Sequence, residues 1–188
     1  GDGGDELFGG YNRYLYGESI WQRISKVPTP IKKMLSYAAL NTSEKIWNKI
    51  GLTYNSIKPG SRGISNLGNK IHRLCEQILP SKNFKDFNLN LLSTFIEPDN
   101  LLFDKVFEPS SHFEETLPKY CNDSLSMQMM IQDIRGYLPD DILCKVDRAS
   151  MGIGLETRAP FLDPDIISLS TRIPIKMKIR NGQSKWIL

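Results

Sequence analysis

The 188-residue sequence predicts a mainly α-helical fold. In most segments, apolar residues recur at three- and four-residue spacing, which places them on one side of a helix. Residues 123–138 are apolar around nearly the whole circumference and are expected to form a buried helix. Regular alternation of apolar and polar residues occurs at residues 175–180, which is too little strand for a self-sufficient parallel sheet.

The first expected helix covers residues 5–16. Its apolar residues share one side, namely Leu7, Phe8, Tyr11 and Leu15. Gly9 and Gly10 lie inside this stretch, although each glycine costs a helix about 1 kcal/mol relative to alanine. Their presence indicates that another group approaches the backbone closely at this point.

Four more helices are expected before residue 123, at residues 29–40, 41–50, 69–79 and 84–96. Thr29 and Pro30 form a cap followed by a first-turn proline. Asn41 with Glu44 resembles a capping box. Residues 51–68 are rich in Gly, Ser, Asn and Pro, and are expected to form a loop.

In the last third of the sequence, Pro139 is expected to end the helix of residues 123–138. The methionines of that helix are interpreted as core filling and not as a soft-metal site. A capped helix is expected at residues 163–171. Residues 175–180 are expected to form a short strand that a turn at residues 181–182 closes.

Composition describes an ordinary globular protein, with 40% hydrophobic and 24% charged residues. The net charge of +3 does not indicate nucleic-acid binding. No run approaches the roughly 20 apolar residues of a membrane span, and no secretory leader is recognised. Three widely spaced cysteines are interpreted as reduced structural thiols. A cytoplasmic location, without a membrane or nucleic-acid partner, is therefore expected.

Both ends of the sequence resemble cuts in a longer chain. The sequence begins inside a glycine-rich motif without an initiator Met, and it stops in what is expected to be the first turn of a helix, at residues 185–188. We therefore expect one domain, residues 1–188, that is a fragment of a longer enzyme. No repeat or linker divides it.

The opening run Gly-Asp-Gly-Gly-Asp-Glu combines glycines with carboxylates. Glycines let backbone N–H groups reach a phosphate, and the N-terminus of the following helix favours an anion. Two carboxylates would repel a bare phosphate, so a Mg²⁺ ion between them is expected. Taken alone, the run also fits an ordinary acidic helix start, and it matches neither the P-loop nor the dinucleotide fingerprint.

Two later segments carry charges that could serve chemistry. Residues 137–163 place acids and bases among apolar residues, where charges are costly unless they pair. A structural network, with Asp147 next to Arg148 and Glu156 paired with Arg158, is the alternative interpretation. Lys185 follows a glycine turn and could lie over a ligand, although lone lysines are mostly solvated.

Together the three segments resemble the synthetase domain of glutamine-dependent asparagine synthetases. The opening resembles that family's Ser-Gly-[Glu/Asp]-Gly-x-Asp-Glu-x-Phe-x-Gly-Tyr, with Gly1 in its second place. Residues 137–163 resemble Tyr-Leu-x-x-Asp-x-Leu-x-Lys-x-Asp-Arg-x-Ser-Met followed by Leu-Glu-x-Arg-x-Pro-Phe-Leu-Asp. The end resembles Gly-x-x-Lys-x-x-Leu. Residues 21–122 carry no motif that we recognise.

The resemblance implies a fold, an activity and cofactors. The chain would be the helical C-terminal part of an α/β synthetase domain of the adenine-nucleotide α-hydrolase-like (PP-loop) type. That domain uses ATP and Mg²⁺ to convert a carboxylate, usually aspartate, into an acyl-adenylate. Ammonia from an N-terminal glutaminase domain then gives the amide, with AMP and pyrophosphate as products. Association as a homodimer is left open.

The resemblance also assigns residues. The backbones of three glycines would contact ATP, at Gly1, Gly3 and Gly4. Asp5 would bind Mg²⁺, and Lys185 would stabilise the pentavalent α-phosphate and the leaving pyrophosphate. Asp2 holds the acidic position tied to the acyl-adenylate, where it would position that intermediate or accept a proton from the amine. Asp141 is a weaker candidate to assist it.

The sequence departs from the family pattern in two ways. The pyrophosphate-binding Ser-Gly-Gly-x-Asp-Ser loop, with the family's other metal-binding aspartate, is absent, as is the glutaminase nucleophile. We therefore expect these 188 residues to be inactive alone. Two other hypotheses stay open. The first is a related enzyme that acts on a sugar carboxylate or closes a β-lactam ring, although Asp2 favours amide transfer over ring closure. The second is a non-catalytic helical module.

Overall fold

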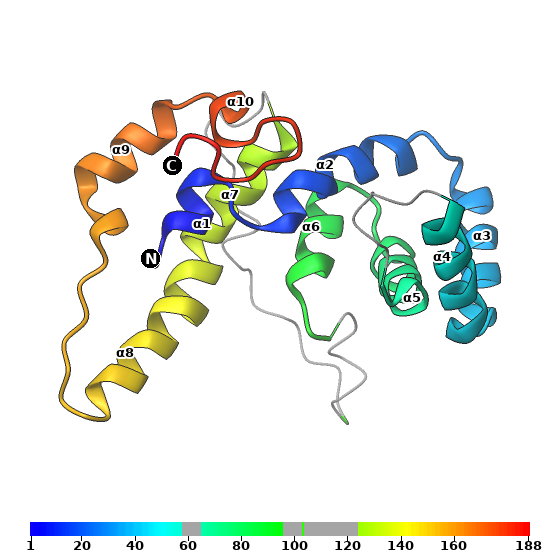
Figure 1. The fold of residues 1–188 in the computed structure, drawn as a ribbon, viewed down its shortest axis with the longest axis horizontal. Helices are drawn as coiled ribbons and strands as arrows, with labels where there is room; N and C mark the ends of the chain where they lie inside the picture. The colour runs from blue at the N-terminus through cyan, green and yellow to red at the C-terminus, as the bar shows by residue number, and fades with distance from the viewer. Residues whose placement is uncertain (58–64, 96–102, 104–123) are drawn as a thin grey trace. The chain divides into compact units, whose positions relative to one another are not determined.

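The computed structural model describes residues 1–57, 65–95, 103 and 124–188 (Figure 1). Within these ranges the secondary structure is helical, apart from one isolated β-bridge between Arg180 and Gln183. The prediction of a mainly α-helical chain is confirmed. Among the described residues, no helix combines the length and the apolar character that crossing a bilayer requires.

The chain divides into two compact units, Gly1–Trp21 with Asp104–Leu188, and Gln22–Phe103. The first unit holds α1 (Gly4–Phe8), α7 (Leu125–Arg135), a π-helical segment (Leu138–Leu143), α8 (Cys144–Met151), a 3₁₀ turn (Pro160–Leu162), α9 (Pro164–Arg172) and α10 (Ile175–Lys178). The second unit holds α3 (Thr29–Asn41), α4 (Glu44–Ile57), α5 (Leu67–Ile78) and α6 (Phe84–Leu92). Helix α2 (Asn12–Ile24) begins in the first unit and ends in the second.

Helix α7 forms the centre of the first unit, and α1 packs against it (Figure 1). The Ser124 side chain caps α7 by accepting a hydrogen bond from the Met127 N–H. Burial extends around most of this helix, as the sequence predicted, and includes Met129, Met130 and Asp133. The buried side chains of Leu7, Phe8 and Tyr14 complete this core from α1 and α2. The methionines therefore fill the core.

The expected single helix over residues 5–16 is in fact two helices. Helix α1 ends at Gly9, whose φ of 73° lies in the left-handed region that glycine adopts without strain. The Gly9 N–H donates to the Asp5 carbonyl, which closes the short helix. Helix α2 begins at Asn12, so the two glycines turn the chain between helices.

Of three further expectations in the first unit, those for Pro139 and for residues 175–180 need correction, and the cap at Asp163 is confirmed. Pro139 does not end a helix, because the hydrogen bonding of α7 is already interrupted at Gly136. Pro139 instead falls in the first turn of the π-helical segment, where its missing N–H costs little. Helix α9 is capped by Asp163 as predicted, through a 2.9 Å hydrogen bond from the Asp165 N–H. The expected strand at residues 175–180 is wrong, because α10 follows directly after Pro174.

The predicted turn at Asn181 and Gly182 is confirmed. Both residues have positive φ, 51° and 74°, and Arg180 and Gln183 exchange two backbone hydrogen bonds of 3.0 and 2.9 Å. This is the arrangement that an Asn-Gly pair favours in a two-residue turn.

In the second unit the helices predicted at residues 29–40 and 69–79 are confirmed as α3 and α5. Helix α6 is shorter than predicted and ends at Leu92. The expected loop over residues 51–68 is wrong at residues 51–57, which belong to α4, and at residues 67–68, which begin α5; residues 58–64 lie outside the described residues. The expected capping box is also wrong, because Asn41 still belongs to α3 and the Lys45 N–H donates to Ser43 Oγ.

The core position of Met129, whose side chain is fully buried, gives a test of the first unit. Met129→Ala is expected to lower the free energy of unfolding by roughly 2–5 kcal/mol, because it removes buried apolar surface and leaves a cavity. Urea-induced unfolding followed by circular dichroism measures the change. Met151→Ala is the control, because Met151 is exposed on α8; equal losses in the two variants would contradict the assignment of the core.

Candidate functional site

An ion pair joins the two ends of the sequence. Lys185 Nζ lies 2.9 Å from Asp5 Oδ1, and each side chain retains 35% of its exposure. Asp5 lies in the first turn of α1, and Lys185 follows the turn at residues 181–182 with a left-handed φ of 52°. The structure thus brings together the first and third segments that the sequence singled out.

Gly10 provides the space for this pair. A Cβ atom built on Gly10 would lie 1.8 Å from Asp5 Oδ1 and 2.5 Å from Lys185 Cε. At Gly9, a Cβ would lie 2.9 Å from Ile179 Cγ1. The prediction of close approach at these two glycines is confirmed, and the approaching groups come from Asp5 of α1 and from the C-terminal segment.

The opening glycines pack against the second sequence segment. A Cβ on Gly3 would lie 2.5 Å from Leu162 Cδ2, and Gly3 has a φ of 83°. Gly1 and Gly4 lie beside the Phe161 ring, which a Cβ would approach to 3.4 and 3.3 Å. Gly3 and Gly4 therefore have a packing role that is independent of any phosphate.

The remaining predicted acids differ in their surroundings. Asp2 is half-buried in the turn that precedes α1. Asp141 lies in the π-helical segment, where its Oδ1 is 2.5 Å from Lys145 Nζ, with the two side chains 32% and 71% exposed. Its observed partner is therefore Lys145 and not a member of the Asp5–Lys185 pair. The alternative pairing of Glu156 with Arg158 is observed at 2.9 Å, but both side chains are highly exposed, so it stabilises little.

Sequence reasoning missed a set of polar residues beneath Asp5. Glu6 is 1% exposed, and its Oε1 accepts a 2.6 Å hydrogen bond from the Tyr11 hydroxyl. Burial, followed by this hydrogen bond and the Glu6 charge, raises the pKa of Tyr11 well above its usual value. Arg13 pairs with Asp133 on α7, 120 residues away. Two signals were available: Glu6 stands directly before apolar Leu7 and Phe8, and Glu6 and Tyr11 both belong to the opening motif.

The donor set fits Mg²⁺ only in part. In the portion of the chain that the structure describes, no cluster of three or more His, Cys, Asp or Glu side chains could enclose a metal ion. Mg²⁺, however, usually binds through one or two carboxylates, with waters and substrate phosphates filling its other positions. Asp5 Oδ1 already contacts a cation, the Lys185 ammonium, and the Asp5 side chain is 35% exposed. Asp5 can therefore serve as one ligand.

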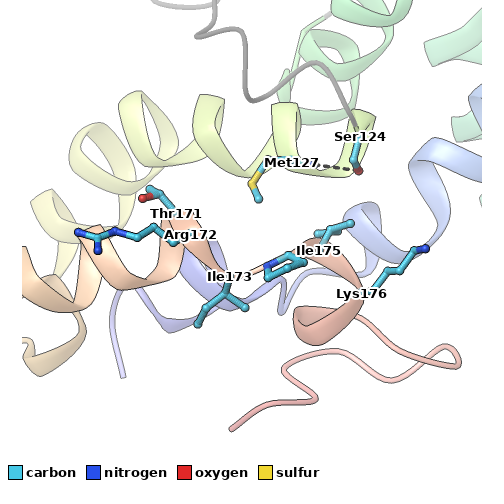
Figure 2. A pocket seen from close by; sticks show the side chains of 8 residues that line it. Ser124, Met127, Thr171, Arg172, Ile173, Ile175 and Lys176 are labelled. Atoms are coloured by element: carbon cyan, nitrogen blue, oxygen red, sulfur yellow. Dashed lines mark hydrogen bonds between the residues drawn. The ribbon is translucent and has the colours of Figure 1, made fainter.

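A pocket of about 810 Å³ lies elsewhere in the first unit. Ser124, which caps α7, and Met127 of α7 face the connection between α9 and α10 across it (Figure 2). Apolar Ile173 of the connection and Ile175 at the start of α10 contribute to its lining. None of the residues that the sequence predicted for the site is among those that line this pocket.

Comparison with known proteins identifies relatives over the whole chain. The family model described as asparagine synthase matches residues 1–188. Asparagine synthetase [glutamine-hydrolyzing] 1 of Bacillus subtilis (strain 168) is 29% identical over 192 residues, which cover 100% of this chain and 26% of the relative. A putative asparagine synthetase [glutamine-hydrolyzing] of Mycobacterium tuberculosis (strain ATCC 25618 / H37Rv) is 27% identical over 194 residues, with the same two coverages. The chain thus spans about a quarter of the length of these relatives, and no solved structure matches it.

The ion pair predicts the effect of a side chain at position 10. Gly10→Ala is expected to separate Asp5 from Lys185, because the atoms that the new methyl group displaces are the ends of flexible side chains. Competitive lysine acetylation with mass spectrometry should show Lys185 reacting faster. Gly152→Ala is the control, since a Cβ there would come no closer than 3.3 Å to its neighbours; unchanged labelling in Gly10→Ala would contradict the geometry.

Lys178 predicts a pH dependence of stability. Its side chain is 2% exposed, and burial lowers its pKa from 10.5 to about 8. Between these two values the unfolded chain binds more protons than the folded chain, so this residue makes stability rise with pH. Relative to Lys178→Met, the wild type should gain roughly 1–3 kcal/mol across that interval. Urea-induced unfolding at several pH values measures the difference in the free energy of unfolding between the wild type and Lys178→Met. Lys176→Met is the control, because Lys176 is exposed and its difference from the wild type should not change with pH. A difference for Lys178→Met that is equally constant with pH would refute the prediction.

Proposed function

The chain belongs to the asparagine synthase family, and on that premise we propose that it forms part of an ATP-dependent amidotransferase. The observation that carries the proposal is the 2.9 Å pair between Asp5 and Lys185. It places an acid and a base together from the two segments in which the family resemblance predicts the metal ligand and the phosphate-binding cation. Both side chains remain 35% exposed, so a ligand can reach them.

We propose a two-step reaction. A carboxylate oxygen of the acceptor, aspartate in the first instance, attacks the α-phosphorus of ATP. The bond from that phosphorus to the departing pyrophosphate oxygen breaks, and an acyl-adenylate forms. Ammonia derived from glutamine then attacks the acyl carbon, the carbon–oxygen bond to AMP breaks, and a base accepts the proton that the nitrogen loses.

Lys185 has the properties that the first step requires. A partly exposed ion pair contributes little stability, so its ammonium can leave Asp5 for an arriving phosphate at small cost. Negative charge then builds on the α-phosphate and on the leaving pyrophosphate, and a preorganised cation offsets it. One such contact is typically worth about 3 kcal/mol, or roughly a hundredfold in rate.

Asp5 is proposed to hold Mg²⁺ once Lys185 has moved to the phosphates. When bound, the ion neutralises charge on the phosphate oxygens. The carboxylate oxygen that now accepts Lys185 at 2.9 Å would be the one available to the metal. Asp5 would supply one ligand only, and the other protein ligand would come from elsewhere in the longer polypeptide.

The other predicted residues have supporting roles in this proposal. Asp2, half-buried before α1, would position the intermediate or accept the proton that ammonia loses. Asp141 could assist only after separating from Lys145. Gly1 is exposed and is the best placed of the three opening glycines to offer its backbone to ATP, since Gly3 and Gly4 pack against Leu162 and Phe161.

The whole enzyme requires parts beyond these residues, because the chain spans 26% of its relatives. We propose that it is the helical C-terminal part of an α/β synthetase domain of the PP-loop type. A pyrophosphate loop and a glutaminase domain would be carried by the rest of the polypeptide. These 188 residues alone are accordingly proposed to be inactive.

The proposal is tested by pyrophosphate release in the full-length polypeptide with ATP, Mg²⁺, glutamine and aspartate. Lys185→Met and Asp5→Asn are each expected to reduce the rate by about a hundredfold or more, because each removes a group that meets the phosphates or their metal. Lys176→Met is the control, since Lys176 is an exposed lysine of the same segment. A wild-type rate in Lys185→Met would rule out its role.

The same assay separates acceptors. Replacing aspartate by a sugar carboxylate should abolish pyrophosphate release if the enzyme is an asparagine synthetase. Faster release with the sugar acceptor would assign the chain to a related amidotransferase with the same adenylating step.

A further inference from the structure

Helix α1, which carries Asp5, cannot fix its own orientation. It has five residues, its N-cap Gly3 provides no side-chain hydrogen bond, and it ends at Gly9. Isolated helices of this length are unstable in water, so tertiary contacts must hold it. Adjacent residues point about 100° apart around a helix axis. The contacts of Glu6 therefore help to determine where the carboxylate of Asp5 points.

The position of the Glu6 side chain depends on Tyr11. The Tyr11 hydroxyl donates to Glu6 Oε1 over 2.6 Å, and the Glu6 side chain is 1% exposed. A buried carboxylate without a donor would be costly, so the position of Tyr11 constrains the rotation of α1.

Tyr11 is in turn held by Arg13. The Arg13 guanidinium carbon lies 4.2 Å from the centre of the Tyr11 ring and 5.0 Å from that of Tyr137. The Tyr11 and Tyr137 rings meet edge to face, with centroids 5.9 Å apart and planes at 77°. Cations over aromatic faces at these distances attract the ring, so Arg13 restricts the movement of Tyr11.

Arg13 is anchored on the central helix α7. Its Nε and Nη2 lie 3.1 and 2.7 Å from Asp133 Oδ2, and the Tyr14 hydroxyl donates to the same oxygen. Asp133 is fully buried. The contacts therefore run without interruption from α7 through Arg13, Tyr11 and Glu6 to the helix that carries Asp5.

We propose that Arg13 is a positioning residue, which directs the Asp5 carboxylate toward Lys185 by holding Tyr11 against Glu6. The claim that Arg13 positions a metal ligand rests on the proposed function. The claim that Arg13 maintains the Asp5–Lys185 pair does not. Lysine could retain the charge opposite Asp133. It cannot reproduce both the two-donor contact with Asp133 and the contact of the guanidinium with the tyrosine rings, because its ammonium is a compact point charge.

The test compares Arg13→Lys with Arg23→Lys in the full-length polypeptide. Arg23 is an exposed arginine on the same helix, α2, and is the matched control. The first measurement is the acetylation rate of Lys185 by mass spectrometry, with Asp5→Asn as the reference for a broken pair. The second is the Mg²⁺ concentration that gives half-maximal pyrophosphate release, together with the melting temperature.

In Arg13→Lys, the Lys185 acetylation rate is expected to rise toward the Asp5→Asn value. The half-saturating Mg²⁺ concentration is expected to rise about tenfold, as is usual when a group that orients a metal ligand is removed. Arg23→Lys should match the wild type in both measurements. A lower melting temperature with unchanged labelling and unchanged Mg²⁺ dependence would show a purely structural role and overturn the proposal.

Tyr11→Phe supplies a second variant if Arg13→Lys does not fold. It removes only the hydroxyl that reaches Glu6, and the same increase in Lys185 labelling is expected; no increase would overturn the proposal. The two proposals fail separately. Faster labelling of Lys185 in a protein whose wild type releases no pyrophosphate would retain the positioning role of Arg13 and reject the proposed function.

Discussion

The meeting of Asp5 with Lys185 depends on the missing side chain at position 10. The space that a Cβ of Gly10 would fill is occupied by Asp5 Oδ1 and Lys185 Cε. The C-terminal segment that delivers Lys185 is itself held in place, because the Trp186 N–H donates to the Lys178 carbonyl over 2.9 Å. One backbone position without a side chain therefore lets segments from opposite ends of the sequence form a common site.

Local patterns predicted those parts of the fold that local interactions determine. The buried helix α7, the Asp163 cap and the Asn181–Gly182 turn follow from periodicity, capping and backbone preference within a few residues. The loop expected over residues 51–68 was wrong at its two ends, where Gly51 and Gly68 were interpreted as loop residues. In the structure Gly51 is buried within α4, and a Cβ on Gly68 would lie 2.5 Å from the Glu44 carbonyl oxygen. Gly68 therefore allows close packing of α5 against α4, which periodicity within one segment does not reveal.

The candidate site could be predicted to the extent that motifs in a fixed order contain its residues. Asp5 and Lys185 were identified from three motifs in sequence order, and the structure brings these two residues together. The support beneath them was not predictable, because Arg13 and Asp133 are 120 residues apart and neither stands out from its neighbours. The glycines also show that a local pattern can have a distant cause. Gly3 and Gly4 resembled a phosphate-binding loop, but packing against Leu162 and Phe161 already accounts for their lack of side chains.

Two ion pairs of the first unit, Arg13–Asp133 and Asp5–Lys185, differ in a way that suits a site in which one part must be rigid and another must exchange partners. Asp133 is fully buried and Arg13 is 19% exposed, so removing either partner would leave a costly unpaired charge. Asp5 and Lys185 are each 35% exposed, and such a pair exchanges partners at small cost. A buried pair of this kind adds little net stability compared with apolar packing; its value lies in allowing one arrangement of Tyr11 and Glu6. The buried pair holds α1 in place, and the exposed pair can exchange partners. This combination is expected where a charged ligand must displace one partner of the exposed pair without moving the helix that carries the other.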